Sequence, residues 1–247
     1  MEKQLFQADS TRRVISISDK ITRDIVACYG YPVEQISMVR NGVPQVGVPT
    51  RDQRDHARRE LGISSEDKII LFVGTGWERK GLRFAIQAVE NLARNNPAIS
   101  LLVAGKGSQR RYISPVVKFL GPVKQMATVY AASDLFVTPT IFEPFSLAAL
   151  EAFSAGLPVI TSAAAGISEI MVPGVHGEVI ATPSDVPALT EALKKWIRIT
   201  DDPEGISQAR SACATLASGF TLERNLRETL KVIDELIAEK SGRITKV

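Results

Sequence analysis

The apolar and polar positions of this chain fall into blocks that predict strands and helices in turn. Short, continuous apolar runs rich in β-branched residues predict buried strands. They lie at residues 14–18, 36–40, 68–75, 100–104, 116–120, 135–138, 158–161 and 177–180. Amphipathic or apolar stretches predict helices between most of these strands. The helices lie at 18–30, 80–95, 124–132, 144–155 and 168–172, and three more close the chain, the last at 222–240.

This alternation indicates an α/β protein in which a Rossmann-like parallel sheet carries helices on both faces. In such sheets ligands bind at the carboxyl ends of the strands, where loops meet the N-termini of helices. Three loops expected at that edge have unusual compositions, namely GTGWERKG, GKGS and TPTIFEPFS. The functional chemistry is therefore expected in these loops.

The stretch VPQVGVPTRDQ, rich in proline and glycine, predicts a domain boundary close to residue 45. A charged helix that ends at Gly62 follows it. We accordingly expect residues 1–45 to form a separate segment with its linker and residues 46–247 to form the ligand-binding domain.

Composition narrows the function classes. The net charge is only +3, and basic residues are scattered among acidic ones, so nucleic acid is not an expected partner. A weakly basic face for an anionic substrate or membrane surface remains open. The sequence has neither a signal-peptide h-region nor an apolar run long enough to span a membrane, so we expect a cytoplasmic protein. Cys28 and Cys213 are expected to be buried thiols.

The loop GTGWERKG (74–81) has the position of a phosphate-binding loop but matches neither common motif. A dinucleotide fingerprint would need a third glycine where Arg79 stands, and a Walker A loop would need lysine where Leu82 follows Gly81. A phosphate between Arg79 and Lys80 would be bound by both charges and by the helix dipole. The alternative is two solvated basic residues.

The segment EPFSLAALEAF predicts a second anion site. Pro144 suits the first position of a helix, which would leave the backbone amides of Phe145, Ser146 and Leu147 free. These amides would point at a ligand held between this loop and the basic loop.

Two glutamates, Glu143 and Glu151, interrupt the same apolar segment. A buried carboxylate is costly unless it has a partner. Sugar hydroxyls could pair with Glu143, and a ribose diol could pair with Glu151. Alternatively, Glu143 caps the helix and Glu151 pairs with a core arginine or lysine. Two carboxylates beside one anion site favour a nucleotide-diphospho-sugar as the ligand.

EPFSLAALE resembles the E-x-F-S/G-x-x-x-x-E signature of the group 1 glycosyltransferases, a family of retaining enzymes with the GT-B fold. The resemblance extends over SDKITRDIVACYGYPVEQISMVRNGV, FVGTGWERKGL, LLVAGKG, FLGPV, MATVYAASDLFVTPT and AAGISEIMVPGVHGEVI, and so runs from about residue 5 to 240. It implies that the second domain is the donor-binding, C-terminal half of a GT-B fold.

The resemblance also implies roles for individual residues. Arg79 and Lys80 would bind the donor pyrophosphate, and Glu143 would contact the sugar, so these three are the expected catalytic residues. The donor would further be held by Gly74, Thr75, Val123, Phe145, Ser146, Leu147 and Glu151, with Val123 near the base and Glu151 on the ribose. The two carboxylates would then be paired with ligand hydroxyls.

The form GWERKG is similar to the subgroup that contains the lipopolysaccharide core glucosyltransferase, which implies UDP-glucose or a similar donor. Thr75 stands where many family members have a basic residue. The chain has no D-x-D motif, which fits a metal-independent reaction without a cofactor. The implied acceptor is a saccharide or glycolipid of the cell envelope, reached by peripheral contact with the inner face of the membrane.

Residues 1–45 resemble only the last segments of the family's N-terminal acceptor domain. His56 and His176 do not match the histidine of that domain and are expected at the surface. Exposed apolar residues in this segment, Val14, Ile15 and Ile25, would favour self-association.

Three hypotheses follow. The first is a retaining glycosyltransferase or its donor-binding half, and the second is a non-catalytic module that binds nucleotide sugars. A dehydrogenase-type Rossmann domain is the third, and the absence of the third glycine argues against it.

Overall fold

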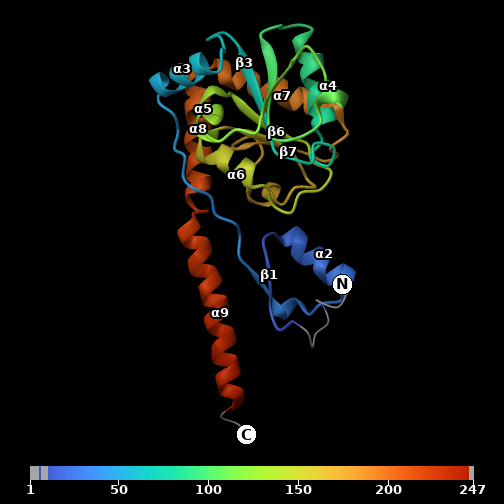
Figure 1. Cartoon of the computed structure of the whole chain (residues 1–247), viewed down its shortest axis with the longest axis vertical. Coiled ribbons are helices and arrows are strands. Elements are labelled where there is room, and N and C mark those ends of the chain that lie inside the picture. The colour runs from blue at the N-terminus through green and yellow to red at the C-terminus, as the bar shows by residue number, and fades with distance from the viewer. Residues whose placement is uncertain (1–5, 7–10, 245–247) are drawn as a thin grey trace. The chain divides into compact units, whose positions relative to one another are not determined.

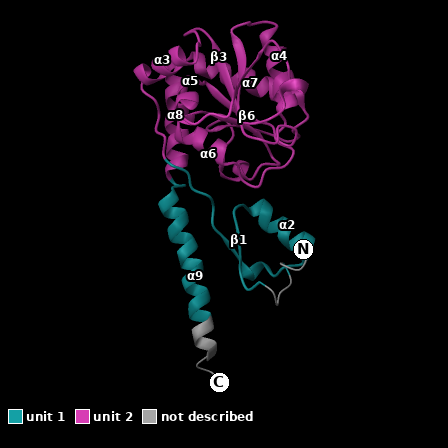
Figure 2. Ribbon diagram, in the orientation of Figure 1, with its two compact units in different colours: residues 1–44, 219–247 teal, residues 45–218 magenta. Residues whose placement is uncertain are grey.

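The computed structural model describes residue 6 and residues 11–244, with side chains described up to residue 239. The chain forms two compact units (Figure 2). The smaller contains residues 1–44 and 219–247, and the larger contains residues 45–218.

The larger unit is built on a six-stranded sheet whose order is β5-β4-β3-β6-β7-β8, with every neighbouring pair parallel. The strands are β3 (Lys68–Val73), β4 (Ile99–Ala104), β5 (Val117–Gly121), β6 (Leu135–Thr138), β7 (Val159–Ser162) and β8 (Gly177–Ile180). The predicted parallel sheet is thus confirmed, with strand ends displaced by at most two residues.

Helices cover both faces of this sheet (Figure 1). The helices α4 (Leu82–Ala93) and α7 (Val186–Asp201) pack together on one face. The other face carries α3 (Arg51–Glu60), α5 (Met126–Ala132), α6 (Leu147–Ser154) and α8 (Pro203–Ser218). Consecutive residues of β3, Ile70, Leu71 and Phe72, are fully buried because both sides of the strand are covered.

The strand order changes direction between β3 and β6. From β3 the chain proceeds outward through β4 to β5, then returns to β6 on the other side of β3. Loops that follow neighbouring strands diverge at such a switch point, which is where open α/β sheets bind their ligands. The loops at this switch point are those after β3 and β6, which contain the predicted basic residues and Glu143.

The smaller unit contains the parallel pair β1 (Val14–Ser16) and β2 (Ile36–Met38), with α2 (Asp19–Tyr29) between them, and the helix α9 (Leu222–Ile244). Ser18 caps α2, where its hydroxyl accepts from the Ile21 amide, and the left-handed Gly30 ends it, in agreement with the helix expected at 18–30.

The segment from residue 219 onward groups with residues 1–44, which differs from the two-part division expected from the sequence. The Asn225 side-chain amide donates to the Arg40 carbonyl at 2.9 Å, and the Val43 amide donates to the Phe220 carbonyl at 3.0 Å. These contacts join segments far apart in the sequence, so composition alone could not reveal the grouping.

Several local predictions need correction. Residues 166–170 form a 3₁₀-helix, η3 (Gly166–Ile170), where an α-helix was expected at 168–172. Cys28 is exposed because α2 buries only Ile25 and leaves its last turn uncovered, whereas Cys213 is buried as predicted. Three apolar residues of the first segment were expected to be exposed. Ile25 is buried and Val14 is half-buried, whereas Ile15 is 40% exposed.

No helix in the described part of the chain has the length and apolar character needed to cross a membrane.

Candidate functional site

The loops after β3 and β6 are joined by ion pairs across the switch point. Lys80 Nζ lies 2.8 Å from Glu143 Oε2, and Arg79 Nη1 lies 3.3 Å from the same oxygen. The Arg79 guanidinium also donates to the Phe142 carbonyl. The structure therefore brings together the three residues expected to be catalytic, from two loops more than sixty positions apart.

Lys80 is buried, whereas the Arg79 side chain is 45% exposed. The interpretation of both as solvated basic residues is therefore wrong for Lys80. A buried ammonium is tolerated because Glu143, itself only 12% exposed at its side chain, supplies an opposite charge. One carboxylate faces two cations here, so the cluster carries a net positive charge.

Two glycines make this arrangement possible. A Cβ on Gly74 would lie 2.7 Å from Lys80 Cε, so the lysine side chain crosses the loop only because residue 74 has none. A Cβ on Gly81 would lie 1.9 Å from the Pro139 carbonyl oxygen. Both glycines also have positive φ angles, 138° and 76°. The two glycines therefore allow the two loops to pack against each other. Thr75, in the loop after β3, is exposed.

Helix α6 begins at Leu147, three residues later than predicted. Ser146 is its N-cap, with φ of 92°, and its hydroxyl accepts from the Ala149 amide at 3.4 Å. Pro144 therefore precedes the helix and is not its first residue. The outward-pointing first amides are those of Leu147 and Ala148. Ser146 has the only positive φ outside glycine in the described chain, and strain of this kind clusters at functional sites.

The loop after β7 supports the Glu143 loop, and sequence reasoning did not identify this contribution. The Glu143 amide donates to the Ala164 carbonyl at 3.2 Å, and the Glu143 carbonyl accepts from the Gly166 amide at 2.9 Å. The carbonyl of Phe145, which is buried, accepts from the Ile167 amide at 2.8 Å. These backbone bonds fix the position of the carboxylate.

Glu151 is paired neither with a core arginine nor with a core lysine, but with a tyrosine. Its Oε2 accepts from the Tyr130 hydroxyl at 2.7 Å, and the same hydroxyl lies 3.2 Å from the Ala148 carbonyl. Burial, followed by the charge of Glu151, raises the pKa of Tyr130, so the tyrosine remains a neutral donor. Glu151 is half-buried, and no contact found in the described residues joins it to the Lys80–Glu143 pair. Each glutamate is therefore paired within the protein.

The same edge of the sheet has a hollow of about 620 Å³ between the loops after β3 and β4. Arg79 and Arg111 both line it, and Trp77 forms part of its wall. The Trp77 indole donates to the Gly74 carbonyl at 2.9 Å and stacks on Phe119 at 5.4 Å. Val123, in the loop that follows β5 at the same edge, is half-buried.

The two histidines lie away from this cluster. His56 is exposed on α3, as expected. His176 is half-buried, and its Nδ1 accepts from the Val172 amide at 3.0 Å. Burial lowers the pKa of His176. Among residues 11–239 and residue 6, no group of three histidine, cysteine or acidic side chains could hold a metal ion.

Comparisons with known proteins identify the family of the chain. A family model described as "Glycosyl transferases group 1" matches residues 67–198, more than half of the chain. The glycogen synthase of Mycobacterium tuberculosis is 30% identical over 241 residues, which cover 93% of this chain and 55% of the synthase. The chain spans about half the length of the curated relatives it matches.

Solved structures give the same fold. WaaG, a glycosyltransferase involved in lipopolysaccharide biosynthesis, superposes with a TM-score of 0.73 at 26% identity, over 86% of this chain and 60% of WaaG. Anabaena HepE, solved in complex with UDP-glucose, superposes with a TM-score of 0.77 over 91% of this chain and 64% of HepE. Its 22% identity supports the fold alone. The chain belongs to the group 1 glycosyltransferases, and its larger unit has the fold of their GT-B C-terminal domains.

Proposed function

We propose that this chain is the donor-binding part of a retaining, family 4 glycosyltransferase that transfers a hexose from a UDP-linked sugar. The observation that carries the proposal is the Lys80–Glu143–Arg79 cluster across the switch point of the sheet. The similarity to WaaG, which is involved in lipopolysaccharide biosynthesis, supports a cell-envelope acceptor, and the complex of HepE shows that this fold can hold UDP-glucose. We propose a saccharide or glycolipid of the cell envelope as the acceptor.

In this proposal the donor diphosphate takes the place of Glu143 as the partner of Lys80 and Arg79. Charge-assisted hydrogen bonds to a diphosphate are strong, and the first amides of α6 add donors beside them. Glu143, released from the cations, then accepts hydrogen bonds from the sugar hydroxyls. The ion pair therefore holds the site in order until a donor arrives.

The same groups would assist bond cleavage. As the bond between the sugar and the diphosphate breaks, negative charge grows on the leaving phosphate, where Lys80 and Arg79 stabilise it. The leaving phosphate would take the proton of the attacking acceptor hydroxyl on the same face, which retains the anomeric configuration. Glu151 would accept the ribose hydroxyls while Tyr130 holds it in position, and Val123 would lie against the base. The mechanism needs no metal or additional cofactor.

Other properties of the protein are part of the same proposal. A glycolipid acceptor would require peripheral contact with the inner face of a membrane by a cytoplasmic enzyme. The exposed Ile15 on β1 would favour self-association, and nucleic acid would not be a partner.

The proposal can be tested by calorimetric titration of UDP, UDP-glucose and NAD. We expect UDP and UDP-glucose to bind and NAD not to bind. Lys80→Gln should weaken UDP binding roughly 10- to 100-fold, the effect of losing a hydrogen bond to a charged group of about 1.5–3 kcal/mol. Lys194→Gln, on the exposed surface of α7, is the matched control and should bind like the wild type.

Melting curves without ligand show whether Lys80→Gln remains folded, so that weak binding is not mistaken for unfolding. Failure of UDP and UDP-glucose to bind at millimolar concentration would reject the donor site. Binding that never leads to transfer, even with acceptor and a complementing N-terminal domain present, would favour a non-catalytic nucleotide-sugar module.

A further inference from the structure

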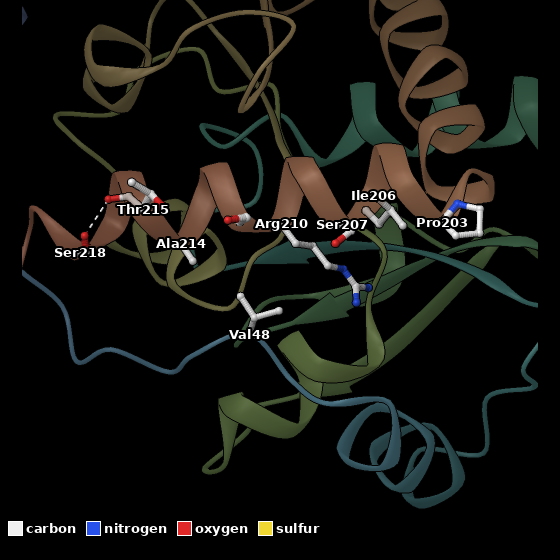
Figure 3. Close-up of a pocket in the computed structure, with 9 residues that line it drawn as sticks. Val48, Pro203, Ile206, Ser207, Arg210, Ala214, Thr215 and Ser218 are labelled. Atoms are coloured by element: carbon white, nitrogen blue, oxygen red, sulfur yellow. Dashed lines mark hydrogen bonds between the residues drawn. The ribbon is translucent and has the colours of Figure 1, made fainter.

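A second concave site lies along α8, and apart from Val48 all the residues that line it belong to this helix (Figure 3). The groove has a volume of about 770 Å³. It is lined by Val48, Pro203, Ile206, Ser207, Arg210, Ser211, Ala214, Thr215 and Ser218. None of these residues belongs to the proposed donor site.

Arg210 is the charged residue of this groove, and it extends from α8 toward the side on which Val48 lies (Figure 3). Its Nε atom is buried and has no hydrogen-bond acceptor within the described structure. No described carboxylate forms an ion pair with its guanidinium. The side chain is held near Val48 because Gly156 leaves room: a Cβ there would lie 3.0 Å from Val48 Cγ2 and 3.2 Å from Arg210 Cβ.

The neighbouring charges do not compensate Arg210. Asp134 is 5% exposed, and its two oxygens already accept from Arg54 at 2.6 Å and from Arg58 at 3.4 Å. The second oxygen also accepts from the Ile69 amide at 2.8 Å. Two guanidinium groups therefore already occupy this carboxylate. Burial, followed by the charge of Arg54, lowers the pKa of Arg210.

A half-buried cation without an ion-pair partner is unfavourable, and an anion in the groove would pair with the guanidinium group. A guanidinium offers a planar fork of donors that matches two oxygens of a phosphate group. The hydroxyls of Ser207 and Ser211, one turn apart on α8, line the same groove and can bind a hydroxylated body. Val48 and Ile206 provide apolar wall beside them.

We propose that this groove binds a small phosphorylated polyol, such as a sugar phosphate, with the phosphate on Arg210 and the hydroxylated part along Ser207 and Ser211. The site is separate from the donor site and does not depend on the function proposed for it.

The Arg210 Nε–H signal in a ¹H–¹⁵N spectrum of the whole chain is a direct probe. We expect glucose 6-phosphate to shift this signal and the Ser207 and Ser211 amide signals saturably, and inorganic phosphate to shift them more weakly. Glucose, and sodium chloride at the same ionic strength, should leave them in place. Because phosphate could also enter the donor site, Lys80→Gln is included and should retain the α8 shifts.

Arg210→Gln should abolish the shifts at Ser207 and Ser211, whereas Arg198→Gln, an exposed arginine on α7, should not. In thermal melts glucose 6-phosphate should raise the Tm of the wild type but not that of Arg210→Gln. Arg210→Lys retains the positive charge but lacks the planar fork of guanidinium donors, so it should bind glucose 6-phosphate at least several-fold more weakly. Equal phosphate-dependent shifts in wild type and Arg210→Gln, or shifts confined to the donor loops, would overturn the proposal.

Discussion

Glu143 and Glu151 belong to the same short segment, yet their environments differ. Glu143 faces two cations, and in our proposal the donor diphosphate replaces it as their partner. Glu151 faces the hydroxyl of Tyr130, a neutral donor that orients one carboxylate oxygen. The sequence located both residues, but their partners lie on distant segments. Local patterns of polarity do not specify such pairs, so the partners could not be predicted.

We predict that Glu151→Ala preserves the fold and weakens UDP binding by about 1–3 kcal/mol, the cost of leaving buried hydroxyls unpaired. The Tyr130 hydroxyl retains an alternative acceptor in the Ala148 carbonyl at 3.2 Å, so stability should change little. Calorimetry gives the affinity, and melting without ligand gives the stability. Tyr130→Phe serves as a comparison that removes only the orienting donor. A large drop in Tm for Glu151→Ala would instead assign Glu151 to the structure of the core.

At the scale of elements, the strands were predictable because a buried parallel strand is a continuous apolar run bounded by polar residues. The start of α6 was misplaced because Pro144 is a favourable first residue, whereas the left-handed Ser146 performs the capping instead. The 3₁₀-helix at 166–170 was mistaken for an α-helix, since a short apolar segment does not distinguish the two.

The turn that leads into β8 provides a pH-dependent element through His176. Its neutral Nδ1 accepts the Val172 amide, and burial lowers the pKa of the ring below its ordinary value of 6.5. Between the lowered pKa and 6.5 the unfolded chain binds more protons, so this contribution to stability is present above pH 6.5 and decreases as the pH falls.

His176→Gln should therefore narrow the difference between stability at pH 8 and at pH 5.5. Urea unfolding at both values measures it, with His56→Gln on the exposed surface of α3 as the control. An identical pH dependence in wild type and His176→Gln would contradict this assignment.

At the scale of the whole molecule, every donor contact that we propose, from Gly74 to Glu151, comes from the larger unit. The carboxyl edge of a parallel sheet collects these residues whatever their order in the sequence. That convergence explains why the fold class and the composition of the loops were enough to predict that Arg79, Lys80 and Glu143 lie close together. The grouping of α9 with residues 1–44 was not predictable, because it depends on a few long-range hydrogen bonds.

The chain spans about half the length of its curated relatives, which leads to a prediction for the purified 247-residue protein. It should bind UDP or UDP-glucose with a dissociation constant on the order of a millimolar and transfer no sugar. Positioning of two reactants can supply roughly 7–11 kcal/mol of a barrier, and in this proposal a facing domain places the acceptor. In a site open to water, the charges of Lys80 and Arg79 also stabilise a leaving phosphate less.

Radiolabelled UDP-glucose with glycolipid and saccharide acceptors would measure this transfer, with Lys80→Gln as the background. Transfer by the wild-type chain above that background would show that the acceptor is placed without a facing domain. The acceptor would then have to be held by the described loops themselves. The hollow lined by Arg79 and Arg111 would be the first place to look for it, because it lies beside the loop that carries Lys80.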